Sequence, residues 1–496
     1  MKIKLNKTKS TSMKVSYPSV ILAVAFACTT SPVLAQETAV VEKSEQPVKN
    51  GTEGPFKSKL TKEEIAEIKE APGIAGVYSE INDSNPYLAA DETDHTLILT
   101  LKNEYRGASR PSATGDYGPD VDAWVQYGAI NYQSDNLLNW IDIEAGVYTT
   151  QKLHADPNKS ARFYLNGHDD FTLVSGSVNI KPTENIQLKL GRFGTDSGAG
   201  TLEYYIPLIE KTSIRPTPSM KEGALLQVDF DNLHLYGMVS TKFAGHYYSE
   251  WTDEGTIQGV NPDGSLIRDK IPKYHLAGVW NNTKGTGTRL AFGTSYQENH
   301  SYQYMFNAQQ LYIDSNKAFW KAELRGFYAE LIDYTKDLNT MYMGSGYDNT
   351  YLVSGQLTYH NDGLTLIGSA GQVGTKLSFL TMIDTDLGYS FDQSIDRNHN
   401  DMLSWQIGGF YQVTKTLQTG IAIVKTDGYE DPSEEVHVDG TGVNLIFIHQ
   451  PGGVFEGLKS TLILNKAREY RPGSTFGDEL DYWDVKLTFH YDINIF

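Results

Sequence analysis

One stretch of the chain carries side chains that can recognise a solute without covalent chemistry. These residues are Arg192, Asp196, Tyr204, Tyr205 and Arg215. An arginine guanidinium offers a planar fork of hydrogen-bond donors that suits a carboxylate, and a tyrosine ring can stack on a sugar ring. The alternative is that the tyrosines have a structural role only and pack their segment against the neighbouring strands. Both interpretations of the stretch stay open at this level.

The sequence shows no pattern typical of covalent catalysis. No nucleophile and base stand at a recognisable spacing, and an isolated Ser and His in a chain of 496 residues carry almost no information. Cys28 is the single cysteine, which excludes a disulfide framework. We therefore expect no catalytic residue, no metal site and no cofactor.

Charge and hydropathy exclude two further classes of protein. The formal net charge is −19 at pH 7, which argues against nucleic acid as a partner, because phosphates demand a basic surface. The only long apolar run, residues 20–27, falls far short of the roughly 20 residues that a membrane-spanning helix needs. A helical transporter is excluded.

The N-terminal 94 residues divide into two parts. Residues 1–35 contain five lysines and no acid, then the apolar run, then a small-x-small site at Val33-Leu34-Ala35, which together predict a secretory signal peptide. Residues 36–94 are predicted to be a periplasmic arm, either weakly structured or folded like a plug against the rest of the chain. Within it, residues 61–70 can form a short helix with a narrow apolar stripe of Ile65 and Ile68.

From residue 95 to the C-terminus, short segments alternate between apolar and polar residues. The first of them places three leucines on one face and Lys102 and Glu104 on the other. Such a period of two predicts β-strands with two different faces. The predicted strands are 95–105, 120–134, 139–150, 171–181, 186–192, 223–230, 233–241, 274–282, 288–297, 308–314, 318–329, 350–360, 364–373, 403–413, 417–426, 440–449, 460–467 and 480–495.

The connections between these strands alternate between short and long, which is typical of an outer-membrane barrel. Turns such as Asp231-Asn232 and Asn361-Asp362-Gly363 need only a few residues. The longer series runs through 106–119, 151–170, 193–222, 242–273, 330–349 and 374–402. We predict an all-β fold, a closed antiparallel transmembrane β-barrel of about 18 strands over 95–496, with short periplasmic turns and long external loops.

In such a barrel the apolar faces contact lipid and the polar faces line a wet lumen. Strand phase then assigns a set of charged residues to the lumen. That set includes Lys102, Glu104, Lys189, Arg289, Lys321, Glu323 and Arg325. Basic and acidic walls could face each other across the pore, or the charges could form ordinary ion pairs along the wall.

Two stretches of the chain have a distinctive pattern. The first combines Leu188-Lys189-Leu190-Gly191-Arg192, Ile214-Arg215 with Pro218 and Gly223, and Asp229-Phe230 with Leu233 and Leu235, and the second is the ending Asp484-Val485-Lys486 with Ile495-Phe496. Both stretches resemble the OprD-type substrate-specific porins, which include chitoporins of enteric bacteria. The resemblance implies an eighteen-stranded monomeric barrel in which 193–222 folds inward as a constriction loop. It also raises the possibility of a ladder of basic residues that guides carboxylates. Residues 36–94 have no counterpart in the family.

The resulting prediction is an outer-membrane porin of a Gram-negative bacterium for passive, selective uptake of small hydrophilic nutrients. Oligosaccharides such as chito-oligosaccharides are the first candidates, and basic amino acids or peptides are the alternative. Its partners would be outer-membrane lipid, small solutes and, during biogenesis, the barrel-assembly machinery. A barrel enzyme and a soluble secreted all-β binding protein remain the competing hypotheses.

Overall fold

The structure is a computed structural model of the chain. It describes residues 95–109, 121–134, 137, 140–155, 170–194, 206–209, 220–245, 248–255, 257–260, 266–282, 287–313, 318–332, 348–375, 389–390, 399–431, 436–452, 455, 457–472 and 479–495. The chain divides into two units, Met1–Thr52 and Glu53–Phe496, and all described residues belong to the second. The predicted signal peptide and arm, 1–35 and 36–94, lie outside the described residues.

The described chain is built almost entirely from β-strands. Their bounds are β1 Thr96–Ser109, β2 Val121–Gln133, β3 Ile141–Ala155, β4 Asp170–Thr183, β5 Ile186–Gly194, β6 Met220–Phe230, β7 Leu233–Gly245, β8 Tyr248–Asp253, β9 Ile257–Val260, β10 Leu266–Arg268, β11 Lys273–Asn282, β12 Thr288–Gln297, β13 Ser301–Ile313, β14 Phe319–Leu331, β15 Asn349–Asn361, β16 Leu364–Val373, β17 Asn400–Thr414, β18 Leu417–Asp431, β19 Val436–His449, β20 Leu458–Tyr470 and β21 Glu479–Asn494. Within these ranges no helix is long and apolar enough to cross a membrane.

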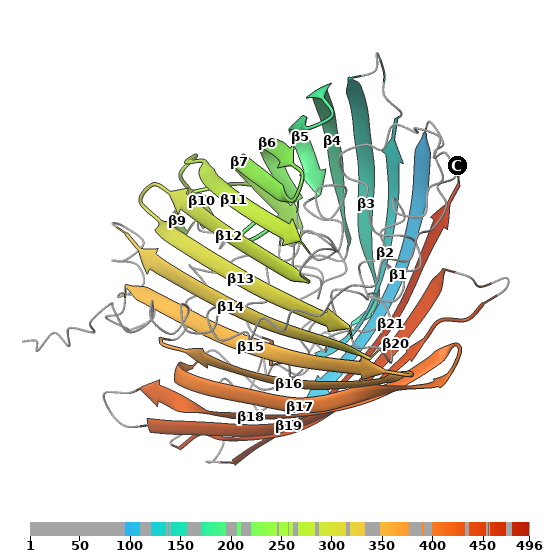
Figure 1. Ribbon diagram of the computed structural model, residues 1–496, viewed down its shortest axis with the longest axis vertical. Helices are drawn as coiled ribbons and strands as arrows, with labels where there is room; N and C mark the ends of the chain where they lie inside the picture. The colour runs from blue at the N-terminus through green and yellow to red at the C-terminus, as the bar shows by residue number, and fades with distance from the viewer. Residues whose placement is uncertain are drawn as a thin grey trace, which may run out of the picture. The chain divides into compact units, whose positions relative to one another are not determined.

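Eighteen of these strands close into one antiparallel barrel, as the sequence predicts. Each strand pairs with its neighbour along the chain, β7 pairs with β11, and β1 joins β21 to complete the ring. Figure 1 shows this joint as the blue first strand beside the red last strand. β8 pairs with the end of β7, and β9 and β10 form a separate two-stranded sheet.

Every predicted strand overlaps one strand of the barrel, but several connections are shorter than predicted because the strands run further. The connection between β18 and β19, for example, is residues 432–435 rather than 427–439. The connection between β12 and β13 is only residues 298–300, so β13 begins at Ser301 rather than at 308. The rings of Tyr296 and Tyr302 stack across this tight hairpin with centroids 4.8 Å apart. The predicted loop 242–273 contains β8, β9 and β10, which alternation did not reveal because these strands are short.

Turn chemistry explains the tight connections. The pair Asp362 and Gly363 joins β15 to β16 with φ of 45° and 78°, a left-handed conformation that Asp tolerates and Gly adopts freely. Asp231, at φ 36°, opens the two-residue connection from β6 to β7 in the same way. These hairpins define a short-turn end of the barrel, opposite a long-loop end.

The two faces of the sheet have the polarity of a barrel in lipid. Leu97, Leu99, Val485 and Leu487 face outward and are partly exposed, whereas Lys102 on the opposite face of β1 is only 4% exposed. A soluble sandwich would bury the leucines in a packed interior instead. The alternation therefore places apolar side chains outside and ionic ones inside.

Aromatic side chains mark the edges of the apolar band. Five strands carry two outward aromatic residues that are eight residues apart: Trp124 and Tyr132, Tyr304 and Tyr312, Trp320 and Tyr328, Tyr351 and Tyr359, and Trp483 and Tyr491. Eight residues span about 27 Å along a strand, or about 21 Å along the axis of a barrel whose strands tilt by about 40°. This height is close to the apolar band of roughly 25 Å that aromatic girdles flank in membrane barrels.

The residue midway between two girdle aromatics provides a test of this band. Leu487 lies between Trp483 and Tyr491 and faces outward. We expect Leu487→Arg to lower the free energy of unfolding by about 2–4 kcal/mol, the cost of a cation at the middle of a bilayer. Urea unfolding in lipid vesicles measures this difference. His449→Arg, on an exposed residue at the short-turn end of β19, is the control and should cost less than about 1 kcal/mol.

Candidate functional site

The interior of the barrel holds the charged residues that strand phase assigned to it. Lys102 and Glu104 lie on β1, Lys189 on β5, Arg289 on β12, and Lys321, Glu323 and Arg325 on β14. Each stands on the inward phase of its strand, opposite the residues of the apolar band. The sequence assigned these positions because alternation fixes the side of the sheet once the lipid-facing side is known.

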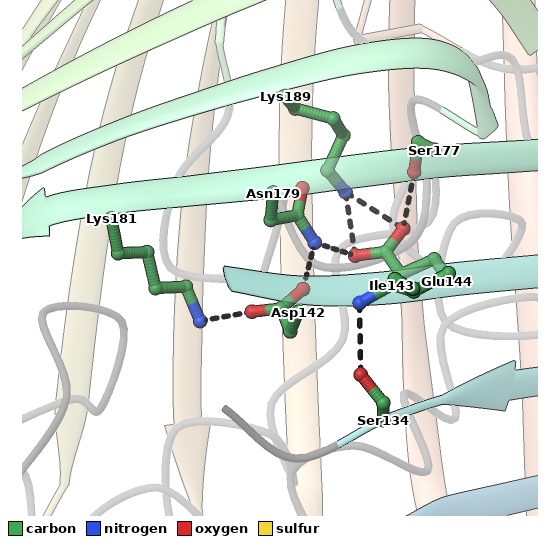
Figure 2. Close-up of polar contacts among 8 residues, drawn as sticks. All are labelled: Ser134, Asp142, Ile143, Glu144, Ser177, Asn179, Lys181 and Lys189. Atoms are coloured by element: carbon green, nitrogen blue, oxygen red, sulfur yellow. Dashed lines mark hydrogen bonds and ion pairs between the residues drawn. The ribbon is translucent and has the colours of Figure 1, made fainter. Parts of the chain in front are cut away.

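One ionic network crosses β3, β4 and β5 near the short-turn end (Figure 2). Lys189 Nζ lies 2.8 Å and 2.9 Å from the two carboxylate oxygens of Glu144, and Asn179 donates to the same carboxylate at 2.8 Å. Asn179 also donates to Asp142, and Lys181 Nζ lies 2.5 Å from the other oxygen of Asp142. Every charge in this network therefore has an opposite partner.

A second network joins the first and last strands of the barrel. Arg106 donates through Nε and Nη2 to Asp484 of β21, with Nη2 at 2.5 Å. Glu104 lies between Lys486 Nζ at 3.2 Å and Lys102 Nζ at 3.8 Å. Because these pairs link β1 to β21, they contribute to the closing joint as well as to the lumen wall.

A third group lies where β5, β6 and β7 approach the long-loop end. Arg192 Nε donates to Glu222 at 2.7 Å, and the guanidinium lies 4.8 Å from the ring centre of Trp251. Trp251 belongs to β8 and packs against inward-facing residues that include Tyr127 and Tyr148. The Arg192 side chain is 40% exposed, which makes it the accessible cation among these networks.

A fourth group centres on β14. Lys321 Nζ lies 3.1 Å from Glu323, and Arg325 Nε donates to Asn307 at 3.0 Å. The Arg325 guanidinium lies 4.7 Å from the ring centre of Tyr389, whose backbone N–H donates to Ser354 at 3.0 Å. The loop between β16 and β17 therefore reaches the inner wall, a contact that no spacing in the sequence indicated.

A short apolar turn lies inside the barrel within the predicted loop 193–222. Residues 206–209, here called the lumenal turn, are all buried, and Ile209 N donates to Ile206 O at 3.2 Å. Pro207 occupies the second position of this turn, and Leu208 occupies the third with φ 66°. A leucine in that conformation is strained by roughly 1–3 kcal/mol, so its packing must offset the strain.

The lumenal turn contacts two apolar clusters of the inner wall. Ile206 and Ile209 pack with residues from β5 to β12, and Leu208 packs with residues from β13 to β17, including Phe327 and Met402. Pro207 lies on Gly293 of β12, where an added Cβ would meet the proline carbonyl oxygen at 2.6 Å. Through these contacts the lumenal turn bridges the wall formed by β5 to β12 and the wall formed by β13 to β17.

The wall from β15 to β19 differs in chemistry from the ionic wall. Its buried polar side chains are all amides and hydroxyls. They are Thr350, Ser354, Gln356, Thr358, Thr365, Ser369, Asn400, Ser404, Gln406, Thr426 and Asn444. Such groups exchange hydrogen bonds with hydroxylated solutes without imposing a charge preference.

Several residues singled out from the sequence cannot be placed. Asp196, Tyr204, Tyr205 and Arg215 lie outside the described residues. Sequence reasoning missed Tyr389, Glu254 and the lumenal turn. Glu254 accepts from Ser240 at 2.7 Å and lies 3.4 Å from Lys221 Nζ. The apolar run Ile206-Pro207-Leu208-Ile209 inside a polar loop was the one available signal for the turn.

Within the described ranges, no group of three or more His, Cys, Asp or Glu side chains is placed to hold a metal ion. The networks above consist of pairs in which a cation already neutralises each acid. Their chemistry is that of a solvated, polar wall.

The comparisons with known proteins give one related sequence and many related folds. The chain is 36% identical over 435 residues to the membrane-associated protein UidC of Escherichia coli strain K12, which covers 86% of this chain and 96% of that protein. No family model matches the chain.

Solved porin structures share the fold at low sequence identity. The structure of OccK9 (OpdG) of Pseudomonas aeruginosa and a BenF-like porin from Pseudomonas fluorescens Pf-5 each match with a TM-score of 0.64 and 14% identity, covering 81% of this chain and 99% of theirs. Pseudomonas aeruginosa OpdK, solved with vanillate, matches with a TM-score of 0.61, 14% identity and the same coverage. The barrel thus has the fold of the OprD-type porins.

The contact between Gly293 and Pro207 yields a prediction about the pore. We expect Gly293→Val to displace the lumenal turn and to change single-channel conductance in planar bilayers, because its side chain would occupy the space of Pro207. Gly326→Val is the matched control, since Gly326 faces outward and nothing lies within 4 Å of its added Cβ. Equal conductance of the two variants would show that the turn does not narrow the path.

The pair of Lys189 and Glu144 yields a prediction about stability. We expect Lys189→Met alone to destabilise the barrel by about 3–5 kcal/mol, because it leaves a buried carboxylate without its cation. The double variant Lys189→Met with Glu144→Gln should recover most of that loss, because the remaining amide keeps its neighbours in hydrogen bonds. Urea unfolding of refolded protein measures both, and equal losses for the two would contradict the pairing.

Proposed function

This chain belongs to the family of the membrane-associated protein UidC, and we propose that it is a diffusion channel of the outer membrane. It would admit small hydrophilic nutrients passively and selectively into the periplasm of a Gram-negative bacterium. The observation that carries the proposal is a closed barrel with an apolar band outside and ion pairs inside. The similarity in fold to solved porins supports the same function.

A barrel of this polarity lowers the barrier to crossing lipid without chemical change of the solute. Hydrocarbon excludes polar molecules, whereas a lumen lined by charges and amides offers them hydrogen-bond partners along the path. Selectivity then depends on the width of the constriction and on the groups that line it. A barrel enzyme would additionally need reactive groups in its loops, and it remains the less favoured alternative.

Neutral, hydroxylated solutes such as oligosaccharides are the substrates that the lining supports best. In the described networks the lysines and most arginines lie beside carboxylates, whereas Arg325 lies beside Asn307 and Tyr389, so the paired part of the wall carries little uncompensated positive charge to guide an anion. The acids are compensated in the same way, so the alternative substrates, basic amino acids and peptides, gain no favoured path. The amides and hydroxyls of β15–β19 supply the groups that a sugar would contact.

The orientation and biogenesis of the barrel follow from the same proposal. The short-turn end would face the periplasm and the long-loop end the exterior, as in other outer-membrane barrels. Outer-membrane lipid would surround the apolar band, and the barrel-assembly machinery would insert the chain, which functions as a monomer.

Single-channel recording in planar bilayers tests the proposed function. We expect stable conductance steps, weak ion selectivity in a salt gradient, and transient block by neutral chito-oligosaccharides or malto-oligosaccharides. Vanillate and lysine serve as anionic and cationic comparison solutes. The absence of conductance would refute a channel, and stronger block by vanillate than by any sugar would refute the neutral substrate class.

Arg192 is the most exposed cation of the four groups described above, and we propose that a passing solute contacts it. Its Nε is engaged by Glu222, its face lies on Trp251, and its side chain is 40% exposed. We expect Arg192→Ala to shorten the dwell time of a blocking oligosaccharide about tenfold, the effect of losing roughly 1.4 kcal/mol. Arg468→Ala, which removes an exposed arginine from the outer face of β20, should leave the dwell time unchanged.

A further inference from the structure

The outer face of four neighbouring strands changes sharply from apolar to polar toward the long-loop end. On β18 the outward side chains are apolar up to Ile423, and the next outward residue is Lys425. The same change takes place at Thr441 on β19, at Lys466 on β20 and at Asp481 on β21. All four polar side chains are exposed and point away from the lumen.

This boundary lies at the level of the aromatic girdle. Lys466 pairs in register with Trp483, one of the girdle residues, and Lys425 pairs in register with Trp405 of β17. The two tryptophans are 47% and 39% exposed on the outer face. Because such aromatic residues lie at the headgroup layer of a bilayer, the two lysines face lipid headgroups.

The cations of this region gather around one hydroxyl. Thr441 pairs in register with Lys425 on one side and with Arg468 on the other, so the three residues form a row across β18, β19 and β20. Two strand spacings separate the Cα atoms of Lys425 and Arg468 by about 10 Å. Their long side chains can therefore meet over Thr441. Lys466 follows on the same face of β20, and we call Lys425, Lys466 and Arg468 the outer basic cluster.

Two cations of the outer basic cluster have acidic neighbours on β21, but the contacts are loose. Lys466 Nζ lies 3.4 Å from Asp481, and Arg468 lies 3.5 Å from Asp481 through Nε and 3.5 Å from Glu479 through Nη1. All four side chains are more than half exposed, so these pairs add little to stability. Nη2 of Arg468 remains for a further oxygen, and the guanidinium suits a bidentate partner.

Lys425 has no acidic partner of its own. Within the described strands no carboxylate lies within ion-pair distance of its ammonium group. Asp427, the next outward residue of β18, instead lies 2.6 Å from His437 Nε2. An exposed, unpaired cation at the headgroup layer attracts the anionic groups that this layer contains, which are lipid phosphates.

We propose that the outer basic cluster binds the phosphate group of a lipid in the surrounding leaflet at the long-loop end. The phosphate would lie over Thr441, between the Lys425 ammonium and the Arg468 guanidinium. Its oxygens accept hydrogen bonds from both cations and from the threonine hydroxyl. Lys466 contacts the same headgroup from the side of the apolar band, along which the acyl chains pack. This site faces lipid rather than the lumen, so it goes beyond the proposed channel function.

Native mass spectrometry of the folded barrel in detergent tests the site with lipid A, whose headgroup carries phosphates. We expect the triple variant Lys425→Gln, Lys466→Gln and Arg468→Gln to bind lipid A at least tenfold more weakly, because three attractions to phosphate are lost. Lys415→Gln, on an exposed lysine in the turn between β17 and β18 at the other end of the barrel, is the matched control and should bind normally. Heat-modifiable migration confirms folding, and Lys425→Gln alone replaces a triple variant that does not fold.

Two comparison ligands identify the occupant. Zwitterionic phosphatidylcholine should bind the wild type and the triple variant equally, and excess inorganic phosphate should leave most of the lipid A bound, because it lacks acyl chains. Equal lipid A binding by the two proteins would overturn the proposal. So would displacement by inorganic phosphate, which would indicate a site for a free anion, or loss of a dimer instead of bound lipid, which would indicate a contact between copies. The measurement needs no ion flow, so a barrel that binds lipid A but never conducts would refute only the proposed channel.

Discussion

The requirement that every backbone N–H and C=O in lipid has an internal partner governs this structure. An open sheet would leave an edge of unpaired groups in hydrocarbon, so eighteen strands close into a ring. The closing joint pairs β1 with β21 from Ile98↔Asn494 to Ser109↔Trp483. The two strands lie at opposite ends of the described sequence. The buried pair of Arg106 and Asp484 strengthens this joint on the lumenal side.

Closure into a barrel places apolar side chains outside and charged side chains inside, the reverse of a soluble sandwich. The ion pairs are a consequence of this arrangement. Charged residues that would stand on the surface of a soluble sheet are gathered on a concave wall, where they are partly removed from water. Lys189 beside Glu144 and Lys486 beside Glu104 show the consequence, since a buried charge requires a partner. The pairs keep the wall polar while leaving it nearly neutral.

Apolar contacts inside the barrel hold the loops that shape the path. The lumenal turn packs on clusters that span β5 to β17, and this packing offsets the strained conformation of Leu208. Tyr389 reaches the same wall at β14 and β15, through Arg325 and Ser354.

The sequence by itself determined the eighteen strands of the barrel, their inward and outward faces and the short turns, because a period of two and turn residues such as Asp362-Gly363 act locally. Leu487 and Lys486 could thus be assigned to opposite faces from spacing alone. Only the tertiary structure decided which charges meet, as for Arg106 and Asp484, and that Tyr389 and residues 206–209 lie on the inner wall. These contacts join residues far apart in the chain, and the barrel brings them together through closure, register and loop packing that no local pattern encodes.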